Sequence, residues 1–412
     1  MFPGCLRDCG GHILKYCSAW SLDLIEMTRI MSGDSVKNIV SIGSPGVTIP
    51  PMDNVISQAV RNEEKGYDSI WWPDHLMGWI PQSIWTPDLF GIASYIPSPN
   101  LFLETTTTIA AVAARTKRIT LGTAVIDAIR RHPAVLAQTI MTLDHIAQGR
   151  LIIGIGTGER ENTSPYGLPY DRLAERMEEA INIMRLLWRS NGSEVSYDGK
   201  FWKLKNAVLH LPPYAGKPPQ IWIAAHRRRM LQIVGRHGDG WLPTQMTKAE
   251  YRKAIDIIEK EAKESGRDPS KIVRGMWAWT ILARDEASAR RMLDSPFAKA
   301  TALILPSEVF EELGYEHPLG KKFYGLTDYV PNHYNRADAM SALERVPVEV
   351  CERAFLFGTP EQVVRRIEEY AELGLQHIVL WNCTYFCDFI KLGDSFHCMD
   401  EIMRHFQKMK EG

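Results

Sequence analysis

Two segments of the chain place titratable side chains directly after short apolar runs that are typical of strands. Residues 67–72 are followed by Asp74 and His75, and residues 151–155 are followed by Glu159. An imidazole titrates near neutral pH and can give or take a proton. A carboxyl group can act as a general acid where burial raises its pKa. The two segments therefore predict proton-transfer chemistry, with His75 and Glu159 as the candidate catalytic residues.

Each of these two residues also has a purely structural interpretation. His75 could only hydrogen-bond the backbone of its own loop, and Glu159 could only form a salt bridge, for instance with Arg160. A further charged group follows the run 118–123, and we interpret it as structural because a His-Pro pair there is typical of a helix start. Its members are Asp127, Arg130, Arg131 and His132.

Small residues follow two of the apolar runs. Gly154, Gly156 and Gly158 alternate there and would let the backbone come close to a ligand. The spacing is not G-x-G-x-x-G and no helix follows it directly, which disfavours a Rossmann dinucleotide site. Residues 122–125 would leave room for a flat ligand at a strand end, although ordinary core packing is the simpler explanation.

A third segment favours the binding of an anion. The run 220–224 is followed by His226 and by three consecutive arginines, residues 227–229, at the expected start of a helix. Backbone amides at a helix N-terminus and arginine side chains both bind phosphate. Thr244 follows the next short run, 240–242, and would add a hydroxyl group to the same corner. The alternative is that the arginines are solvated on an exposed helix face.

The elements that must position these residues alternate along the chain. Strands are expected at residues 37–43, 67–72, 118–123, 151–155, 220–224, 240–242, 272–283 and 377–381. Helices are expected at residues 53–65, 105–115, 133–147, 171–189, 228–236, 248–264, 360–373 and 396–410, with Asp53 and Thr359 as N-caps of two of them. Eight strand–helix units predict a parallel (β/α)₈ TIM barrel, in which functional side chains lie at the carboxyl ends of the strands.

The length of 412 residues fits one barrel with additions. Residues 1–36 are expected to form a flexible N-terminal extension, and residues 37–412 a single barrel domain. Three stretches interrupt the alternation and are interpreted as insertions, at about residues 80–104, 191–218 and 295–350. Without the extension and the insertions roughly 270 residues remain, close to the ~250 of one barrel.

Composition and motifs exclude several classes of function. Lys and Arg total 48 against 49 Asp and Glu, so a nucleic-acid partner is not expected. No apolar run approaches the ~20 residues of a membrane span. The seven cysteines are an odd number without a C-x-x-C pair, which favours a reducing, cytoplasmic location and gives no reason to expect a metal site. P-loop, H-E-x-x-H and G-x-S-x-G motifs are also absent.

Taken together, several motifs resemble the bacterial luciferase-like oxidoreductase superfamily, and within it the branch that uses the deazaflavin coenzyme F420. These motifs are residues 74–75, 122–125, 154–159, 224–225 and 238–241. Within that branch the chain resembles the ketoreductases of mycobacterial lipids, on residues 158–161, 165–167, 211–214, 229–231 and 316–318. The similarity extends from about residue 37 to about residue 400.

The resemblance implies roles for individual residues. Glu159 would move a proton during hydride transfer, with His75 beside it, and Ala124–Val125 would form a cis peptide that backs the deazaflavin ring. The other expected cofactor-binding residues are Asp74 and Asn162 around the ring, and Thr157, Gly158, Ala224, Ala225, His226, Arg227 and Thr244 along the ribityl and phosphate path. Trp79 matches an active-site tryptophan of sugar-phosphate dehydrogenases and is a candidate substrate contact.

The function that the resemblance implies is hydride transfer from reduced F420 to a ketone, with a phthiodiolone-type lipid as the expected substrate. Two alternatives remain open: an FMN-dependent monooxygenase of the same superfamily, and a protein that only carries the deazaflavin. A homodimer is expected, in the cytoplasm or peripheral to the membrane. Apolar residues within 79–102, Trp79, Ile84, Trp85 and Phe90 among them, would either wall a channel for an apolar substrate or form the dimer interface.

Overall fold

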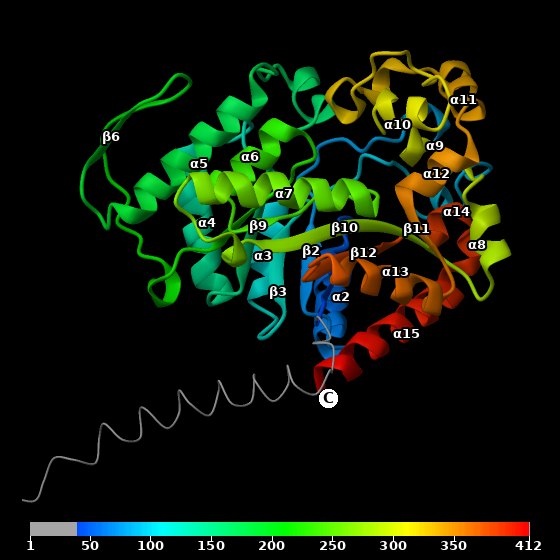
Figure 1. Ribbon diagram of the computed structural model, residues 1–412, viewed down its shortest axis with the longest axis horizontal. Helices are drawn as coiled ribbons and strands as arrows, with labels where there is room; N and C mark the ends of the chain where they lie inside the picture. Colours follow the sequence, from blue (N-terminus) through cyan, green and yellow to red (C-terminus); the bar gives the residue numbers. More distant parts are fainter. Residues whose placement is uncertain (1–38, 412) are drawn as a thin grey trace, which may run out of the picture. The chain divides into compact units, whose positions relative to one another are not determined.

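A computed structural model describes residues 39–411 and contains a closed barrel of eight parallel strands (Figure 1). The expected N-terminal extension, residues 1–36, lies outside the described residues. The barrel strands are β1 (Ser41–Pro45), β2 (Ser69–Trp72), β3 (Thr120–Thr123), β5 (Leu151–Gly156), β8 (Gln220–Ile223), β9 (Gly240–Trp241), β10 (Val273–Leu282) and β12 (His377–Asn382). The barrel closes because β12 pairs with β1, and β10 pairs with both β9 and β12. The predicted (β/α)₈ fold is confirmed.

Eight long helices surround the strands, as the alternation predicts. They are α2 (Met52–Glu64), α3 (Thr105–Ala113), α4 (Pro133–Ala147), α5 (Leu173–Arg189), α6 (Arg228–His237), α7 (Lys248–Glu264), α13 (Pro360–Glu372) and α15 (Leu392–Glu411). Thr359 is the N-cap of α13, as predicted, and it also forms a capping box with Gln362. The predicted N-cap Asp53 is wrong, because α2 begins one residue earlier and Asp53 lies in its first turn.

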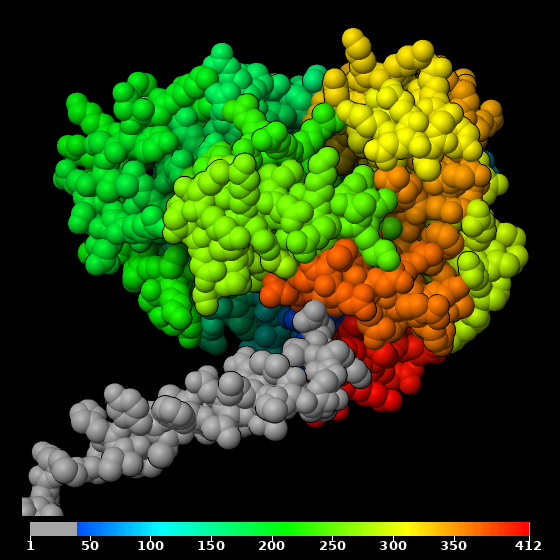
Figure 2. Space-filling model, in the orientation of Figure 1, coloured from blue at the N-terminus to red at the C-terminus, as the bar shows by residue number. Residues whose placement is uncertain are grey.

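The three stretches interpreted as insertions contain short elements of their own. The first holds the turns η1 (Gln82–Ile84) and η2 (Gly91–Ser94), and the second an antiparallel hairpin of β6 (Val195–Asp198) and β7 (Lys203–Ala207). The third holds α9 (Pro296–Leu303), α10 (Ser307–Glu312), α11 (Arg336–Glu344) and the start of α12 (Val348–Ala354). Figure 2 shows this third stretch, in yellow to orange, as a lobe of the surface beside α7. Two short strands, β4 (Ile126–Asp127) and β11 (Phe355–Gly358), are absent from the sequence-based prediction.

The apolar residues of the first insertion lie inside the protein rather than on a free surface. Ile84, Trp85 and Phe90 are at most 7% exposed. They belong to one buried cluster with Phe297 of α9 and Leu343 of α11. Because the first and third insertions cover each other in this way, these three side chains cannot form a dimer interface.

Two properties of the described residues bear on function. No helix within residues 39–411 is both long and apolar enough to cross a membrane. The same residues bring together no group of three or more His, Cys, Asp and Glu side chains that could hold a metal ion.

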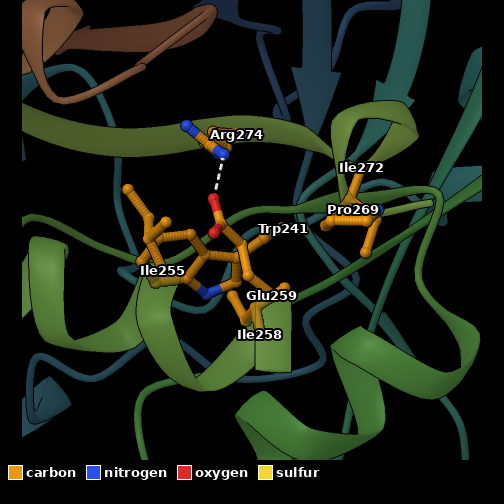
Figure 3. Close-up of a pocket in the computed structure, with 7 residues that line it drawn as sticks. All are labelled: Trp241, Ile255, Ile258, Glu259, Pro269, Ile272 and Arg274. Carbon is orange, nitrogen blue, oxygen red and sulfur yellow. Dashed lines mark hydrogen bonds and ion pairs between the residues drawn. The ribbon is translucent and has the colours of Figure 1, made fainter. Parts of the chain in front are cut away.

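A small cavity under α7 belongs to the packing of the barrel and not to a site (Figure 3). Its volume is about 10 Å³, and it lies against Trp241 and Ile255. Arg274, at the second residue of β10, forms an ion pair of 2.5 Å with Glu259 at its edge. The cavity holds at most one water molecule, and it lies far along the barrel from the carboxyl end of β10.

Candidate active site

His75 and Glu159 lie side by side at the carboxyl ends of β2 and β5. Nε2 of His75 is 3.4 Å from Oε2 of Glu159, and the two side chains are 14% and 28% exposed. Nδ1 of His75 lies 3.2 Å from the carbonyl oxygen of Met77. In the neutral ring Nδ1 therefore carries the hydrogen, and Nε2 faces the carboxyl group. The structure thus brings together the two residues that the sequence predicts to move a proton.

Asn162 holds this pair in place. Its Oδ1 accepts hydrogen bonds from the backbone amides of Leu76 and Met77, at 2.7 and 2.9 Å. Its Nδ2 donates to Oε2 of Glu159 at 3.1 Å. Asn162 is 2% exposed, so the loop after β2 and the carboxyl group after β5 are joined through a buried amide. A contact between Asn162 and a cofactor stays a prediction.

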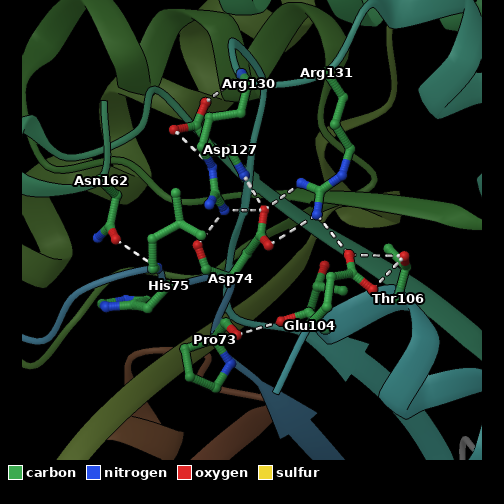
Figure 4. Close-up of polar contacts among 12 residues, drawn as sticks. Pro73, Asp74, His75, Glu104, Thr106, Asp127, Arg130, Arg131 and Asn162 are labelled. Carbon is green, nitrogen blue, oxygen red and sulfur yellow. Dashed lines mark hydrogen bonds and ion pairs between the residues drawn. The ribbon is translucent and has the colours of Figure 1, made fainter. Parts of the chain in front are cut away.

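Asp74 anchors the loop that carries His75 (Figure 4). Arg131 donates to both of its oxygens, at 2.6 and 3.1 Å, and Arg130 forms an ion pair of 2.5 Å with it. Burial alone would raise the pKa of Asp74, but the hydrogen bond from Arg131 and the charges of both arginines outweigh it and lower the pKa. Arg131 also binds Glu104 at 2.7 Å. The Asp74 carboxylate is thus occupied by arginines of this chain, and its predicted contact with a cofactor remains untested.

Ala124 and Val125 after β3, with Gly156 and Gly158 at the end of β5, form a surface of backbone and small side chains, which is called the shelf below. The peptide between Ala124 and Val125 is cis, the conformation expected from the resemblance. A Cβ atom at Gly156 would lie 2.6 Å from Cγ2 of Val125, so the close approach of β5 to Val125 depends on the absence of a side chain at position 156. At Gly158 φ is +79°, where a side chain is strained. Glycine at this end of β5 leaves the space beside the peptide free of a side chain from positions 156 and 158, and the binding of a flat ring there stays a prediction.

A second group of residues offers donors for an anion at the start of α6. Thr244 places its hydroxyl oxygen 2.9 Å from Nε2 of His226. The N-cap of α6, Arg227, makes no side-chain cap hydrogen bond, so the amides of the first turn are left for a ligand. Ala224 and Ala225 lead into this turn directly after β8. The predicted phosphate-path residues of this segment therefore do lie together, although Thr157 is on the neighbouring strand end.

The side chains of Arg227 and Arg229 interact with other residues of the chain. Arg227 binds Glu308 at 3.2 Å and lies 4.8 Å from the ring centroid of Tyr324. Arg229 binds Glu175 at 3.2 Å. Both arginine side chains are more than half exposed. The predicted cluster of three arginines is thus not assembled around one anion, because Arg227 and Arg229 have other partners, and the amides that begin α6 remain the candidate donors.

Trp79 belongs to an aromatic cluster at the carboxyl ends of β10 and β12. Its ring centroid lies 5.7 Å from that of Trp381 and 6.4 Å from those of Trp279 and Phe297. The indole nitrogens of Trp79 and Trp279 are buried, and neither has a hydrogen-bond partner within residues 39–411. An apolar wall with two free N–H donors suits an apolar ligand that carries an oxygen atom.

Sequence reasoning missed one polar residue of the site and gave only a structural role to two others. Arg130 and Arg131 were expected to be structural, and they are, but through Asp74 they fix the position of His75. Glu161, next to Glu159, is fully buried. Nothing in the sequence separates Glu161 from a solvated glutamate, because its burial depends on segments far along the chain.

Comparisons with known proteins show which sequences and structures this chain resembles. The sequence profile of the family described as "Luciferase-like monooxygenase" matches residues 34–377. A phthiodiolone/phenolphthiodiolone dimycocerosates ketoreductase of Mycobacterium kansasii is 39% identical over 320 residues, which cover 77% of this chain and 87% of the relative. An F420-dependent glucose-6-phosphate dehydrogenase of Nakamurella multipartita is 27% identical, over 78% of this chain and 84% of the relative. A solved F420-dependent secondary alcohol dehydrogenase with an F420–acetone adduct has a TM-score of 0.67 at 21% identity, and covers 88% of this chain and 99% of its own.

Proposed function

Since the chain belongs to the luciferase-like monooxygenase family, we propose that it is the F420-dependent member that transfers a hydride from the reduced deazaflavin to a lipid ketone. The coarser statement, that it is an oxidoreductase, follows from its relatives, which are named ketoreductases and F420-dependent dehydrogenases. The single observation that carries the proposal is the pairing of His75 with Glu159 beside the shelf of Ala124 and Val125. In this proposal the proton donor, Glu159, lies next to the surface against which the flat deazaflavin ring would bind.

The residues of the site fit the cofactor. Bound F420 would supply the hydride. The shelf of Ala124 and Val125 would support its ring, and the amides that begin α6, with His226 and Thr244, would hold its phosphate. The same groups would also accept FMN, which shares a flat ring and a phosphate. FMN-dependent monooxygenation therefore remains the second candidate function, favoured by the description of the family.

The protein's own residues supply the proton and the surroundings of the reaction. Glu159 would deliver a proton to the substrate oxygen, and Asn162 keeps its carboxyl group oriented. The aromatic cluster around Trp79 excludes water, and its two indole N–H groups can donate to a substrate oxygen. Its apolar character, together with the ketoreductase named among the relatives, favours a long-chain ketone of the phthiodiolone type.

Separate binding titrations with F420 and with FMN test the choice of cofactor. Fluorescence is followed as each is added to the full chain. Tight binding of F420 with weak or absent binding of FMN supports the proposal. Tight binding of FMN with weak or absent binding of F420 would overturn the proposal in favour of an FMN-dependent monooxygenase. Thr244→Val should weaken the binding of either phosphate-bearing ligand, whereas Thr142→Val, on the exposed side of α4, should not.

A further inference from the structure

Glu161 is a buried carboxyl group two residues beyond Glu159, in the helical turn η3 (Arg160–Asn162). Its exposed fraction is 0%. No donor in the described part of the chain reaches either of its oxygens. An ionised carboxylate in such surroundings is strongly destabilised, so this group must be neutral or share a proton.

The charged neighbour of Glu161 is the carboxyl group of Glu159, at the N-cap of the same turn, and its negative charge acts on Glu161. Ionised carboxylates only accept hydrogen bonds, so two neighbouring carboxyl groups can be joined by a hydrogen bond only where one of them carries a proton. Burial, and then the negative charge of Glu159, raise the pKa of Glu161 well above its ordinary range. Two carboxyl groups that share one proton are a recurring means of keeping an acid protonated near neutral pH.

The other charged and titratable groups around the pair do not replace this proton. Nε of Arg160 donates to the carbonyl oxygen of Thr327 at 2.7 Å, and its guanidinium lies 4.8 Å from the ring centroid of Tyr170. Tyr170 and Tyr329 also face the pair, and burial raises the pKa of both phenols, so that they stay neutral. Asp328 faces Tyr170 and adds a further negative charge to the region.

The pair is continuous with the mouth of the barrel. Oε2 of Glu159 lies 3.4 Å from Nε2 of His75, and the charge of Glu159 acts on Glu161, two residues further along the chain. Three titratable groups therefore form a row from the interior to the candidate substrate position. We propose that Glu161 is a positioning residue that stores the proton which Glu159 delivers to the substrate oxygen, an inference that rests on the proposed ketone reduction.

The proton balance of this step is simple. The carbonyl carbon of the ketone receives the hydride, and the electron pair of the C=O π bond moves to oxygen. The single proton of the pair moves from Glu161 to Glu159, and the O–H bond of Glu159 breaks as this proton forms the O–H bond of the alcohol. The pair, now doubly negative, regains one proton from water by way of His75 before the next turnover.

A first test needs no cofactor. Infrared spectra of the full chain, recorded through a pH titration, report the C=O stretch of protonated carboxyl groups. We expect such a band at pH 7 in the unsubstituted protein and its loss in Glu161→Gln. The control is Glu179→Gln, because the Glu179 carboxylate is also buried but receives backbone N–H groups of Lys200 and Trp202. The control should keep the band. If the C=O band is absent from the unsubstituted protein, or if it persists in Glu161→Gln, the proposal is overturned.

A second test separates proton storage from simple packing. The rate of a single turnover of reduced F420 with a ketone is measured against pH in the unsubstituted chain, Glu161→Gln and Glu161→Asp. For Glu161→Gln we expect a rate about tenfold lower at pH 7 and a half-maximal pH about one unit lower. Glu161→Asp should recover part of that shift. A lower rate with an unmoved half-maximal pH would show a packing role only and contradict the proposal.

The two tests distinguish this inference from the proposed function. If the infrared test fails, the proposal of a shared proton is refuted, but the assignment of F420 as the cofactor is unaffected. Absence of turnover in the unsubstituted chain, with the infrared band present, removes the proposed function and with it the delivery of the proton.

Discussion

Nε2 of His75 and Oε2 of Glu159 lie 3.4 Å apart, although 84 positions separate the two residues in the sequence. The contact is possible because β2 and β5 end at the same rim of the barrel, and because Asn162 binds both the loop of His75 and the carboxyl group. Neither residue is more than about a third exposed. The barrel itself therefore holds the pair in position, as the proposed proton transfer requires.

Replacing His75 should slow the reaction without removing the cofactor. In His75→Ala the single-turnover rate should fall at least about tenfold, because the pair loses its path to water and its orientation. The affinity for F420 should stay within a few-fold. Stopped-flow absorbance measures the first quantity and a fluorescence titration the second. His397→Ala, an exposed histidine on α15, is the control and should change neither.

Removing Arg131 should destabilise the loop of the site. In Arg131→Met the buried Asp74 carboxylate keeps only Arg130, so the free energy of unfolding should fall by about 2–3 kcal/mol. Urea unfolding measures this difference. The pKa of Asp74 is lowered in the folded protein, so its contribution is present above the unfolded pKa of about 3.9 and is lost as the pH falls further. The difference between the two proteins should accordingly shrink in acid, and an equal difference at all pH values would contradict this account.

A methyl group at Gly156 should disturb the shelf. The new Cβ atom would meet Cγ2 of Val125 at 2.6 Å, so the side chain of Val125 must shift toward the expected ring position. Gly156→Ala should cost about 1–3 kcal/mol of stability and weaken F420 binding at least about tenfold. Gly393→Ala is a useful comparison, because Gly393 is exposed, has no positive φ, and its Cβ would meet nothing within 4 Å. Unchanged F420 affinity in Gly156→Ala would place the ring elsewhere.

Glu161→Gln should stabilise the protein, and increasingly so as the pH rises. The pKa of Glu161 is raised by folding, so above the unfolded pKa the unfolded chain releases a proton that the folded protein retains. Stability is therefore lost with rising pH, by about 1.4 kcal/mol per pH unit, until the folded pKa is reached. A glutamine does not titrate and avoids this loss. Urea unfolding between pH 4 and 8 should show the difference growing, and a constant difference would contradict the assignment.

The strands and most helices could be predicted because their signals are local. Eight apolar runs gave the eight barrel strands, and α4 and α7 begin and end where their sequence signals indicate. The start of α2 could not be placed, because Pro51 and Asp53 both suit the first turn of a helix. Strand β11 was missed because it pairs with the far end of β10, a contact that no local pattern records.

The candidate site was predictable in position but not in its connections. Strand ends indicate which residues meet at the barrel mouth, and His75 and Glu159 do meet there. The partners of Asp74 are arginines more than 50 positions away, and the sequence does not assign them to it. Glu161 likewise is fully buried and interacts electrostatically with Tyr329, which lies in the third insertion. Contacts between segments far apart in the chain determine both the partners of Asp74 and the burial of Glu161, and no local sequence pattern indicates such contacts.

The most direct test of the central claim is a single turnover of reduced F420 with a long-chain aliphatic ketone, in the unsubstituted chain and in Glu159→Gln. The account predicts that the unsubstituted protein oxidises the deazaflavin without oxygen and forms one secondary alcohol per cofactor. Glu159→Gln should react about 100-fold more slowly while still binding F420. Oxidation that requires oxygen, or an unchanged rate in Glu159→Gln, would contradict it.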